Sequence, residues 1–305
     1  MLNPQFPYLI SGLQLWQWRS QAIADAIEFN VEVVEVDWLL REITDLDSLA
    51  LRLGSYQDQT QIQIKLSLED LNAFWQRRCK ERLPVQYITS SVPWRHFQLQ
   101  VSPAVLIPRP ETEYLIDLAI AATKDCEYLR DGNWADLGTG SGAIAIGLAS
   151  SFEKATIHAV DVSPDALKIA YANACDLGYI NQIQFYLGSW WEPLLELKGK
   201  FSGMVSNPPY IPTNTVLTLE PEVANHEPNL ALDGGSDGLD YIRKLIEVSP
   251  EFLQPGAVWL IEMMAGQANI VSNLLHNHGS YCNIKIHADL AGIERFAVAY
   301  KNPKS

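Results

Sequence analysis

The first 84 residues carry apolar positions at the three- and four-residue spacing of amphipathic helices. One such stripe consists of Leu13, Trp16, Ile23 and Ile27, and it predicts a first helix that buries this face in the core. Two further helices have recognisable starts. Asp37 is a candidate N-cap for a helix that runs to Ile43, and Ser67 for another, with Asp70 three residues later as in a variant capping box. The glutamine-rich stretch 57–63 is typical of a loop, so residues 1–84 are expected to form a helical domain.

Between Pro84 and Pro110 the pattern changes to strand-like alternation. Residues 86–89 and 97–101 alternate apolar and polar side chains, with two serines and Pro93 between them. This predicts a β-hairpin linker over residues 85–108. The segment after it places Pro110 and the carboxylates of Glu111 and Glu113 together, which suits a helix N-terminus.

After residue 130, short apolar runs alternate with helical patterns, as in a mostly parallel sheet with crossover helices. Strands are expected at residues 134–137, 156–160, 183–186, 203–206, 258–262, 283–288 and 295–299. Helices are expected after Gly142, Pro164, Asp240 and Gln267. Only a few residues around Gly292 separate the last two strands, which therefore should pair antiparallel. The fold class is α/β, with a mostly parallel seven-stranded sheet in a domain spanning residues 109–305.

Composition and charge narrow the class of protein. The 305 residues are 48% hydrophobic and 19% charged, which is typical of a globular chain with a full core. A formal net charge of −14 repels phosphate backbones and argues against a general nucleic-acid binder. The four scattered cysteines and six histidines lack metal-ligand spacing, so we expect buried free thiols and no metal site. Without a signal-peptide pattern or a run of ~18 apolar residues, a cytoplasmic protein is expected.

Residues 204–210, Met-Val-Ser-Asn-Pro-Pro-Tyr, are typical of a short strand that ends in a rigid turn. The two prolines remove two N–H donors and fix two φ angles, which leaves the turn rich in acceptors. The Asn207 side-chain oxygen and a neighbouring carbonyl can accept hydrogen bonds from a planar –NH₂ group while the Tyr210 ring stacks on its face. Such a site suits a reaction at the nitrogen of an amide or aromatic amine. The alternative is a strand-ending turn without chemistry.

Residues 135–144 run from a strand into a helix through three alternating glycines. Glycines let the backbone turn tightly against a ligand, and the helix N-terminus offers free N–H groups. A dinucleotide site would prefer G-x-G-x-x-G, whereas the spacing here is D-x-G-x-G-x-G and favours S-adenosylmethionine. The predicted donor-binding residues of this turn are Gly138, Thr139, Gly140, Ser141 and Gly142.

Two other strand ends are expected at the same edge of the sheet. Asp161, about 20 residues after the glycines, is placed to accept hydrogen bonds from ribose hydroxyls. The alternative role, capping the next helix, suits Ser163 better. Trp190 and Trp191 follow the third strand, where an adenine ring would lie; both also suit a core, and Trp190 is the stronger candidate for stacking. Asn207 then falls at the mouth where open α/β sheets bind ligands, so it belongs to the donor-binding set as well.

Together, the glycine turn and the Asn-Pro-Pro-Tyr turn resemble those of class I (Rossmann-like) methyltransferases that act on exocyclic or amide nitrogen. Within these, the chain is most similar to the release-factor glutamine methyltransferases. Further segments that carry the resemblance are residues 83–88, 106–113, 227–239 and 289–295, so it covers nearly the whole chain. Two features depart from the family pattern: Thr89-Ser90-Ser91 stands where a glycine is usual, and Ser189 where an acidic residue is frequent. They affect the linker and the adenosine pocket respectively.

The resemblance implies transfer of a methyl group from S-adenosyl-L-methionine to the side-chain amide nitrogen (N5) of the glutamine in the Gly-Gly-Gln motif of peptide chain release factors. Asn207 and the Pro208 carbonyl would accept the two amide hydrogens, Pro209 would keep the turn rigid, and Tyr210 would stack on the amide plane. The helical domain would then be a module that recognises the protein substrate. We expect a monomer without direct nucleic-acid contacts.

Three other functions share parts of this pattern. A glutamine methyltransferase acting on a ribosomal protein would use the same catalytic turn. A nucleic-acid adenine-N6 methyltransferase uses a related Asn/Asp-Pro-Pro-aromatic site, against which the acidity of the chain argues. An inactive nucleoside-binding scaffold would not need Gly138, Gly140, Asp161 and Asn207 together. The polar segment 213–227 is a candidate for the lip that receives the substrate loop.

Overall fold

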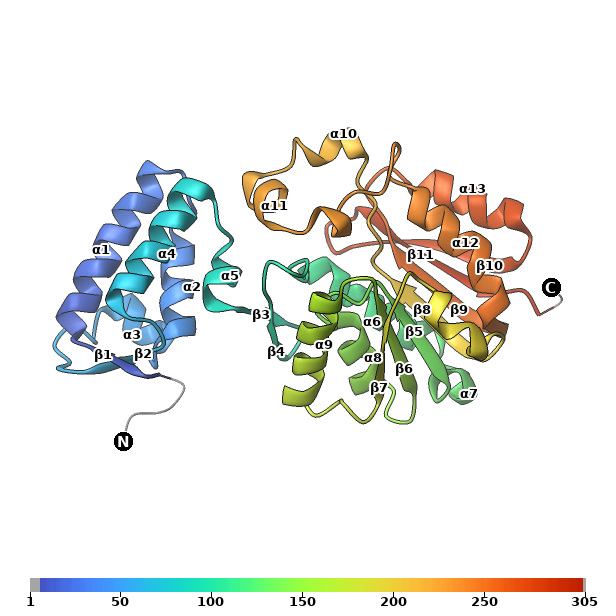
Figure 1. Ribbon diagram of the computed structural model, residues 1–305, viewed down its shortest axis with the longest axis horizontal. Coiled ribbons are helices and arrows are strands. Elements are labelled where there is room, and N and C mark those ends of the chain that lie inside the picture. Colours follow the sequence, from blue (N-terminus) through green and yellow to red (C-terminus); the bar gives the residue numbers. More distant parts are fainter. Residues whose placement is uncertain (1–5, 304–305) are drawn as a thin grey trace. The chain divides into compact units, whose positions relative to one another are not determined.

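The computed structural model describes residues 6–303 (Figure 1). The chain forms two compact units. The N-terminal unit comprises residues 1–90 together with 221–226, and the sheet unit comprises residues 91–220 and 227–305.

The N-terminal unit is mainly helical. Its helices are α1 (Gly12–Glu28), α2 (Val34–Ile43), α3 (Ser48–Leu53), α4 (Leu68–Glu81), α5 (Val85–Thr89) and α11 (Pro221–His226), and its antiparallel strand pair is β1 (Tyr8–Ile10) with β2 (Ile62–Ile64). Trp18 of α1 meets Trp75 of α4 edge to face, with ring centroids 6.1 Å apart. Burial of such large rings supplies much of the stability of a small helical core.

The first helix is confirmed, but its predicted buried face is wrong. Leu13, Trp16 and Ile27 are exposed by 49%, 38% and 69%. The residues that α1 buries include Leu15, Trp18, Ala22 and Ala26. Both sets have helical spacing, and the alanines on the buried face carry little hydrophobic signal although they let neighbouring helices approach closely.

The predicted start of α4 is confirmed, because the Ser67 hydroxyl accepts from the Asp70 backbone N–H at 3.0 Å. The prediction that Asp37 caps a helix is wrong. Helix α2 begins at Val34, and Asp37 lies within its first turn, where it pairs with Arg19 at 2.6 Å. A carboxylate in the first turn interacts favourably with the helix dipole, as a carboxylate at the N-cap position would. The loop expected over residues 57–63 ends at Ile62, where β2 begins.

The segment after Pro84 differs from the predicted hairpin. Residues Val85–Thr89 form the short helix α5, so the strand expected over residues 86–89 is wrong. The hairpin pairs β3 (Ser91–Trp94) with β4 (Phe97–Gln100), and Pro93 lies inside β3 opposite Gln98. A four-residue alternation cannot separate strand from helix, and a proline is tolerated in a two-stranded ladder because both strands are edges.

Helix α11 belongs to the N-terminal unit although it follows Thr89 by more than 130 residues of sequence. The Arg78 guanidinium, whose side chain is 5% exposed, donates to Glu35 on α2 at 2.6 Å and to Glu222 on α11 at 2.9 Å. Arg82 also pairs with Glu222, at 2.7 Å. A buried arginine is stable only when carboxylates accept its hydrogen bonds, and α11 provides one of the two carboxylates that Arg78 needs.

The sheet unit contains seven strands in the order β10-β11-β9-β8-β5-β6-β7. Their bounds are β5 (Asn133–Leu137), β6 (Thr156–Asp161), β7 (Ile183–Leu187), β8 (Phe201–Ser206), β9 (Leu253–Glu262), β10 (Tyr281–Ala288) and β11 (Glu294–Lys301). All seven predicted strands are confirmed. The antiparallel pairing of the last two is confirmed as well, and β11 also runs antiparallel to β9.

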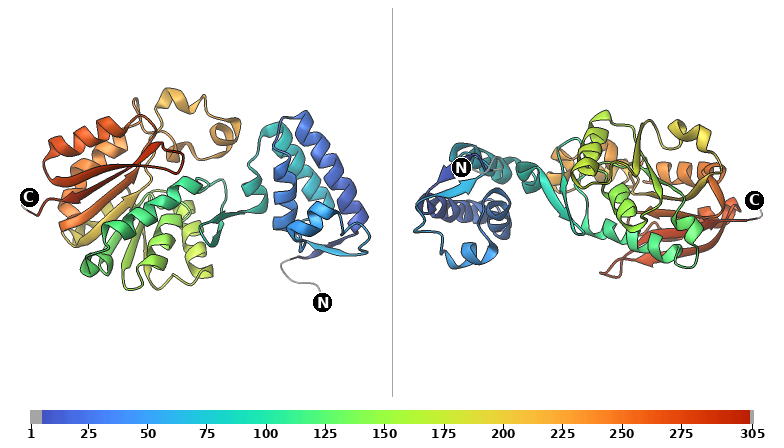
Figure 2. Two further views of the ribbon diagram at one scale, coloured as in Figure 1. Left: turned by 180° about the vertical axis from the view of Figure 1, so that it is seen from behind. Right: turned by 90° about the horizontal axis from the view of Figure 1, so that it is seen from below.

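Helices cover both faces of this sheet (Figures 1 and 2). The helices of the unit are η1 (Pro110–Glu113), α6 (Tyr114–Ala122), α7 (Glu127–Arg130), α8 (Ala143–Ser151), α9 (Pro164–Asp176), η2 (Glu192–Leu197), α10 (Thr213–Val216), η3 (Asn229–Ala231), α12 (Asp240–Phe252) and α13 (Ala268–His278). Strand residues Ala135, Trp259 and Ile261 pack with α12 and α13. Side chains alternate along a strand, so Asp136 and Glu262 face the opposite layer.

Strands β5 and β8 are neighbours at the point where the strand order reverses. Chain segments that leave the carboxyl ends of two such strands diverge, which opens a crevice where α/β sheets bind ligands. The glycine turn follows β5 and the Asn-Pro-Pro-Tyr turn follows β8, so this edge holds both predicted motifs.

Within residues 6–303, no helix combines the length and the apolar character needed to span a membrane. The four cysteines are free thiols. Only Cys79 is buried, whereas Cys175 is exposed and the other two are intermediate, so the prediction that all four are buried is wrong.

Candidate active site

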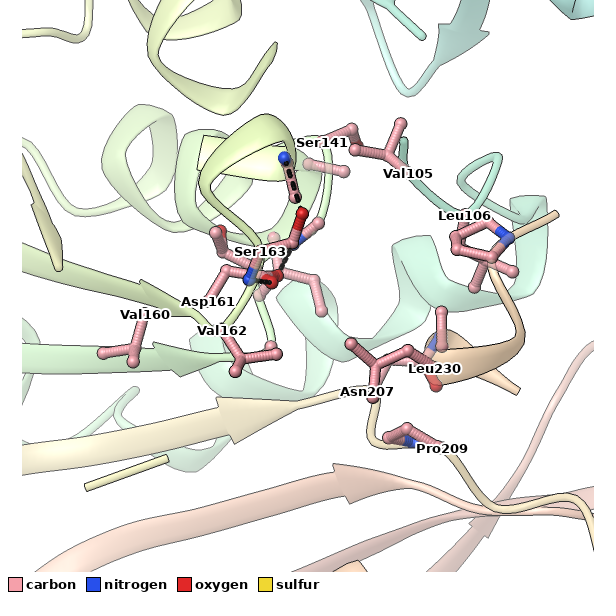
Figure 3. Close-up of a pocket in the computed structure, with 18 of the residues that line it drawn as sticks. Val105, Leu106, Ser141, Val160, Asp161, Val162, Ser163, Asn207, Pro209 and Leu230 are labelled. Atoms are coloured by element: carbon pink, nitrogen blue, oxygen red, sulfur yellow. Dashed lines mark hydrogen bonds between the residues drawn. The ribbon is translucent and has the colours of Figure 1, made fainter. Parts of the chain in front are cut away.

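A cavity of about 280 Å³ opens at the carboxyl edge of the sheet, between the ends of β5, β6, β7 and β8 (Figure 3). The predicted residues that line it are Gly138, Thr139, Gly140, Ser141, Asp161, Trp190, Asn207 and Pro209. A second wall consists of residues 104–106, Pro108, Arg109 and Thr112, and a third of Pro228, Leu230, Ala231 and Tyr241. Its size is at the lower end for sites that bind small molecules.

The glycine turn presents its backbone to this cavity. Gly138, Gly140 and Gly142 have φ angles of +80°, +54° and +84°, which other residues rarely adopt. Gly140 has open space where a Cβ would lie, so a ligand can approach the backbone directly. Gly142 does not line the cavity: a Cβ there would lie 3.1 Å from Ala170 on α9, so this glycine permits close packing of α8 on α9.

A buried carboxylate supports the glycine turn from below. Asp136 of β5 is fully buried, and its Oδ2 accepts from the Thr139 hydroxyl at 2.6 Å and from the Ala145 N–H at 2.9 Å. Because the N-cap residue of α8 is Gly142, which lacks a side chain, Asp136 satisfies one of the free N–H groups in its first turn. Burial raises the pKa of Asp136 to about 7, partly offset by these two hydrogen bonds.

The Asp161 carboxylate lies at the tip of β6 and faces the cavity (Figure 3). It accepts from the backbone N–H of Gly140 at 2.8 Å and of Ser163 at 2.9 Å. Burial raises its pKa, while the backbone donors oppose the shift. Each oxygen retains a further lone pair, so the carboxylate can still accept hydrogen bonds from a ligand. Ser163 caps α9, as predicted, by accepting from Ala166 at 3.1 Å.

The two tryptophans after β7 have separate roles. Trp190 lines the cavity, and its ring lies beside Gly138 and at 5.2 Å from the Tyr241 ring. Its φ of +55° is unusual for a large residue, and such strained backbone is frequent at functional sites. Trp191 is 2% exposed, stacks on Phe252 at 4.5 Å and belongs to the core.

Asn207 faces the cavity from the end of β8 (Figure 3). Its Nδ2 group donates to the Thr112 hydroxyl oxygen at 3.3 Å, which leaves Oδ1 as the free acceptor of the amide. Thr112 in turn donates to Glu262 Oε2 at 2.7 Å, and the Tyr210 hydroxyl donates to Glu262 Oε1 at 3.0 Å. A buried chain of hydrogen bonds therefore connects the two polar side chains of the Asn-Pro-Pro-Tyr turn. Pro208 and Tyr210 do not line the cavity itself.

A second loop supports the backbone of this turn. Added Cβ atoms would lie 2.7 Å from the Pro209 carbonyl oxygen at Gly234 and 2.2 Å from the Tyr210 carbonyl oxygen at Gly238. Gln267 at the start of α13 donates to the same Tyr210 carbonyl at 3.0 Å. Only glycine allows the loop to pack this closely, which explains the two glycines physically.

The sequence did not identify several residues of the site. Thr112 and Glu262 are separated by 150 residues and by no recognisable spacing, so nothing along the chain connects them. Arg109, whose guanidinium holds the buried Glu227 at 2.7 and 2.8 Å, lines the cavity as well. The Glu113 carboxylate accepts from the Arg95 backbone N–H at 2.7 Å and lies outside the cavity lining.

The seven-stranded sheet with its antiparallel β11 and the glycine turn beside an acceptor-rich Asn-Pro-Pro-Tyr turn define a class I S-adenosylmethionine-dependent methyltransferase. The family described as "Methyltransferase domain" matches residues 130–274. The fold is also similar to that of the hMettl16 catalytic domain solved in complex with MAT2A 3'UTR hairpin 6. The TM-score is 0.53 and the identity 11%, over 86% of this chain and 88% of that one.

Curated relatives narrow the class further. Release factor glutamine methyltransferase of Synechocystis sp. is 48% identical over 295 residues, which cover 95% of this chain and 97% of the relative. That of Thermosynechococcus vestitus is 46% identical over 288 residues, covering 94% and 98%. The chain belongs to the release factor glutamine methyltransferase family. It is an enzyme that uses S-adenosylmethionine as methyl donor, so the predicted fold class, enzyme class and donor are confirmed.

Proposed function

We propose that this enzyme methylates the side-chain amide nitrogen (N5) of the glutamine in the Gly-Gly-Gln motif of peptide chain release factors. The observation that carries the proposal is the amide of Asn207, whose Nδ2 is engaged by Thr112 and whose Oδ1 is left to accept hydrogen bonds at the cavity. An amide –NH₂ group is a matching donor. Family membership at 48% identity supports a release factor as the protein that carries this amide.

The residues around the cavity suit the methyl donor. S-adenosylmethionine, when bound, supplies an electrophilic methyl group on a sulfonium. Gly138, Gly140, Thr139 and Ser141 would line its backbone-facing side, Asp161 would accept hydrogen bonds from its ribose, and Trp190 would stack on its adenine. Two matches support this assignment: a carboxylate accepts from hydroxyls as in a ribose, and a flat aromatic ring suits an adenine. The open space at Gly140, where a Cβ would meet nothing within 4 Å, supports close approach of the donor to the backbone.

The chain's own residues act on the substrate by positioning. An amide nitrogen is a weak nucleophile because its lone pair is delocalised, and geometry is what the site offers it. Asn207 Oδ1 and the Pro208 carbonyl would hold the two amide hydrogens, with Pro209 limiting the motion of the turn and Tyr210 packing on the amide plane. Effective molarity gained in this way is worth about 7–11 kcal/mol in favourable cases.

A general base is not part of the proposal. The charged residues that line the cavity are Arg109 and Asp161, and both are engaged, Arg109 by Glu227 and Asp161 by two backbone N–H groups. Hydrogen-bond acceptors at Asn207 and Pro208 instead stabilise the positive charge that develops on nitrogen, and the proton leaves to water after transfer.

We further propose that the helical part recognises the release factor and that the catalytic domain begins near residue 109, after the linker. The enzyme would act as a cytoplasmic monomer without direct contacts to nucleic acid. The net charge of −14 supports the last point, because it repels phosphate groups.

The test is transfer of a labelled methyl group from S-adenosylmethionine to a purified bacterial release factor, beside a release factor whose Gly-Gly-Gln glutamine is replaced by alanine. Label on the first and not on the second is the expected result. Equal labelling of both would place the methyl group elsewhere and contradict the proposal. Transfer to a ribosomal protein or to adenine in nucleic acid, with none to either release factor, would contradict it as well.

A further inference from the structure

Glu262, at the end of β9, is a buried carboxylate without an ion-pair partner among the described residues. Its side chain has no exposed surface, and the nearby Arg295 is paired with Asp289 at 2.6 Å. Removing a carboxylate from water is unfavourable unless other groups replace the lost hydrogen bonds. Here those groups are two hydroxyls, of Thr112 and Tyr210. Both are linked to the Asn-Pro-Pro-Tyr turn, which suggests that the carboxylate serves the site.

The direction of each hydrogen bond in this network follows from the number of hydrogens available. An ionised carboxylate only accepts, so the Thr112 hydroxyl must donate its single hydrogen to Glu262. Thr112 then has only lone pairs to offer Asn207. The Asn207 amide must therefore turn its Nδ2 group toward Thr112, and its Oδ1 atom is left for the substrate.

We propose that Glu262 is a positioning residue that acts through Thr112 to hold the Asn207 amide with its oxygen toward the substrate, and through Tyr210 to fix the aromatic ring. This inference rests on the proposed function, in which Asn207 Oδ1 accepts a hydrogen of the substrate amide. The Glu262 carboxylate, two hydrogen bonds away, thereby determines whether the Asn207 amide turns its oxygen or its nitrogen toward the substrate. If the Asn207 amide rotated by half a turn, its –NH₂ group would face the –NH₂ group of the substrate, and neither could accept a hydrogen bond.

Ionisation of Glu262 is part of this arrangement. Burial raises the pKa of Glu262 to about 7, and the hydroxyls of Thr112 and Tyr210 lower it in opposition. The other charged groups that act on it are Glu111, which raises the pKa, and Arg295, which lowers it. Protonated Glu262 can donate a hydrogen itself, which frees Thr112 to donate to Asn207 Oδ1 and reverses the amide. Turnover should therefore rise as the pH increases through this range.

The experiment compares four variants with the wild-type enzyme. Glu262→Gln places an –NH₂ group against one of the two hydroxyls. Thr112→Val removes the connecting hydroxyl at nearly constant volume, and Thr112→Ser retains it. Tyr210→Phe removes only the second hydroxyl. For each, kcat and KM for the release factor are measured from pH 5.5 to 9, with donor affinity by calorimetry and melting temperature beside them.

The expected result is a fall in kcat of about 100-fold for Glu262→Gln and Thr112→Val, similar to the loss of one oriented hydrogen bond at the reacting centre. The KM and the donor affinity should stay within about threefold. Thr112→Ser should retain at least a third of the wild-type kcat, and Tyr210→Phe should lose less than Thr112→Val. The acid limb of the wild-type profile should be absent from Glu262→Gln.

Two results would overturn the inference: Glu262→Gln with wild-type kcat and an unchanged acid limb, or parallel losses in kcat, donor affinity and melting temperature. If wild-type enzyme labels no release factor, the proposed function fails, and the side-chain amide resonances of Asn207 still decide the inference without substrate. They are assigned by their loss in Asn207→Ala. They should shift in both Glu262→Gln and Thr112→Val but little in Thr112→Ser, and resonances unchanged in all three would contradict the role of Glu262.

Discussion

The two turns that form the site leave neighbouring parallel strands at the same edge of the sheet, and each rests on a buried carboxylate that accepts from a threonine hydroxyl. Under the glycine turn the pair is Asp136 and Thr139, three residues apart. Under the Asn-Pro-Pro-Tyr turn it is Glu262 and Thr112, 150 residues apart. The first turn thus receives its carboxylate from its own strand–turn–helix segment, and Asp161 of β6 accepts from Gly140 as well. The second turn is supported by side chains of η1 and β9, by Gln267 before α13 and by the glycine backbone of the loop at residues 234–238.

This difference matches the two roles that we propose for the turns, donor binding and orientation of the substrate amide. In the proposed function, the glycine turn exposes its backbone to the donor and would hold it by shape. The second turn would have to fix the direction of one amide, which requires oriented side chains from several elements. We therefore expect substitutions in the glycine turn to change donor affinity, and substitutions in or beneath the second turn to change turnover.

Replacing the acceptor itself should have the largest effect. Asn207→Ala should lower kcat by about 100- to 1,000-fold, because the substrate amide loses an oriented hydrogen bond in the transition state. Donor affinity should change by less than about threefold. Single-turnover methylation and calorimetry measure the two quantities, and an Asn207→Ala enzyme with wild-type turnover would remove Asn207 from the mechanism.

A substitution in the glycine turn should instead change donor affinity. Gly140→Ala should weaken donor binding about tenfold, because its methyl group would occupy space that faces the cavity. Gly279→Ala is the matched control, since Gly279 also has a positive φ, of +78°, and open space, but lies at the end of α13. Calorimetry with S-adenosylmethionine should separate the pair. Equal donor affinity in both would show that Gly140 does not contact the donor.

The loop that supports the second turn offers an intermediate effect. In Gly238→Ala the new Cβ would lie 2.2 Å from the Tyr210 carbonyl oxygen, at a φ of +75°. Displacement of the turn should lower kcat about tenfold and the free energy of unfolding by about 2–4 kcal/mol. Gly279→Ala, with the same φ strain and no contact, should lose only about 1 kcal/mol and keep its kcat. Matching losses in the two variants would mean that the contact with Tyr210 is unimportant.

The smallest effect concerns stability and pH. The pKa of Glu262 is about 7, above its value of about 4.3 in an unfolded chain, so the folded state retains a proton that the unfolded state has released. The free energy of unfolding therefore falls as the pH rises between these two values. In Glu262→Gln this contribution, about 3 kcal/mol between pH 5 and pH 8, should disappear. Urea unfolding of both proteins at the two pH values measures it, and identical pH dependence would contradict the raised pKa.

The contrast between the turns also explains what the sequence could predict. Strand positions, the last antiparallel pair and the glycine turn follow from patterns within about ten residues. The structure confirms the strands and the fold class, although β9 begins at Leu253, five residues before its predicted start. The contacts from Glu262 and Gly238 to the second turn are long-range and have no local signature. The wrong face of α1 has a similar origin, because two stripes with helical spacing compete and only tertiary packing chooses the one that contains Ala22 and Ala26.

Helix α11 has a consequence for exchanging parts between related enzymes. The chain passes between the two units three times, after residues 90, 220 and 226. A graft of residues 1–90 from another enzyme would bring a foreign helix α4 against a resident six-residue cassette that carries Glu222, the partner of Arg78 and Arg82. The transplantable module is therefore discontinuous in sequence, and a working chimaera needs residues 221–226 from the same parent as residues 1–90.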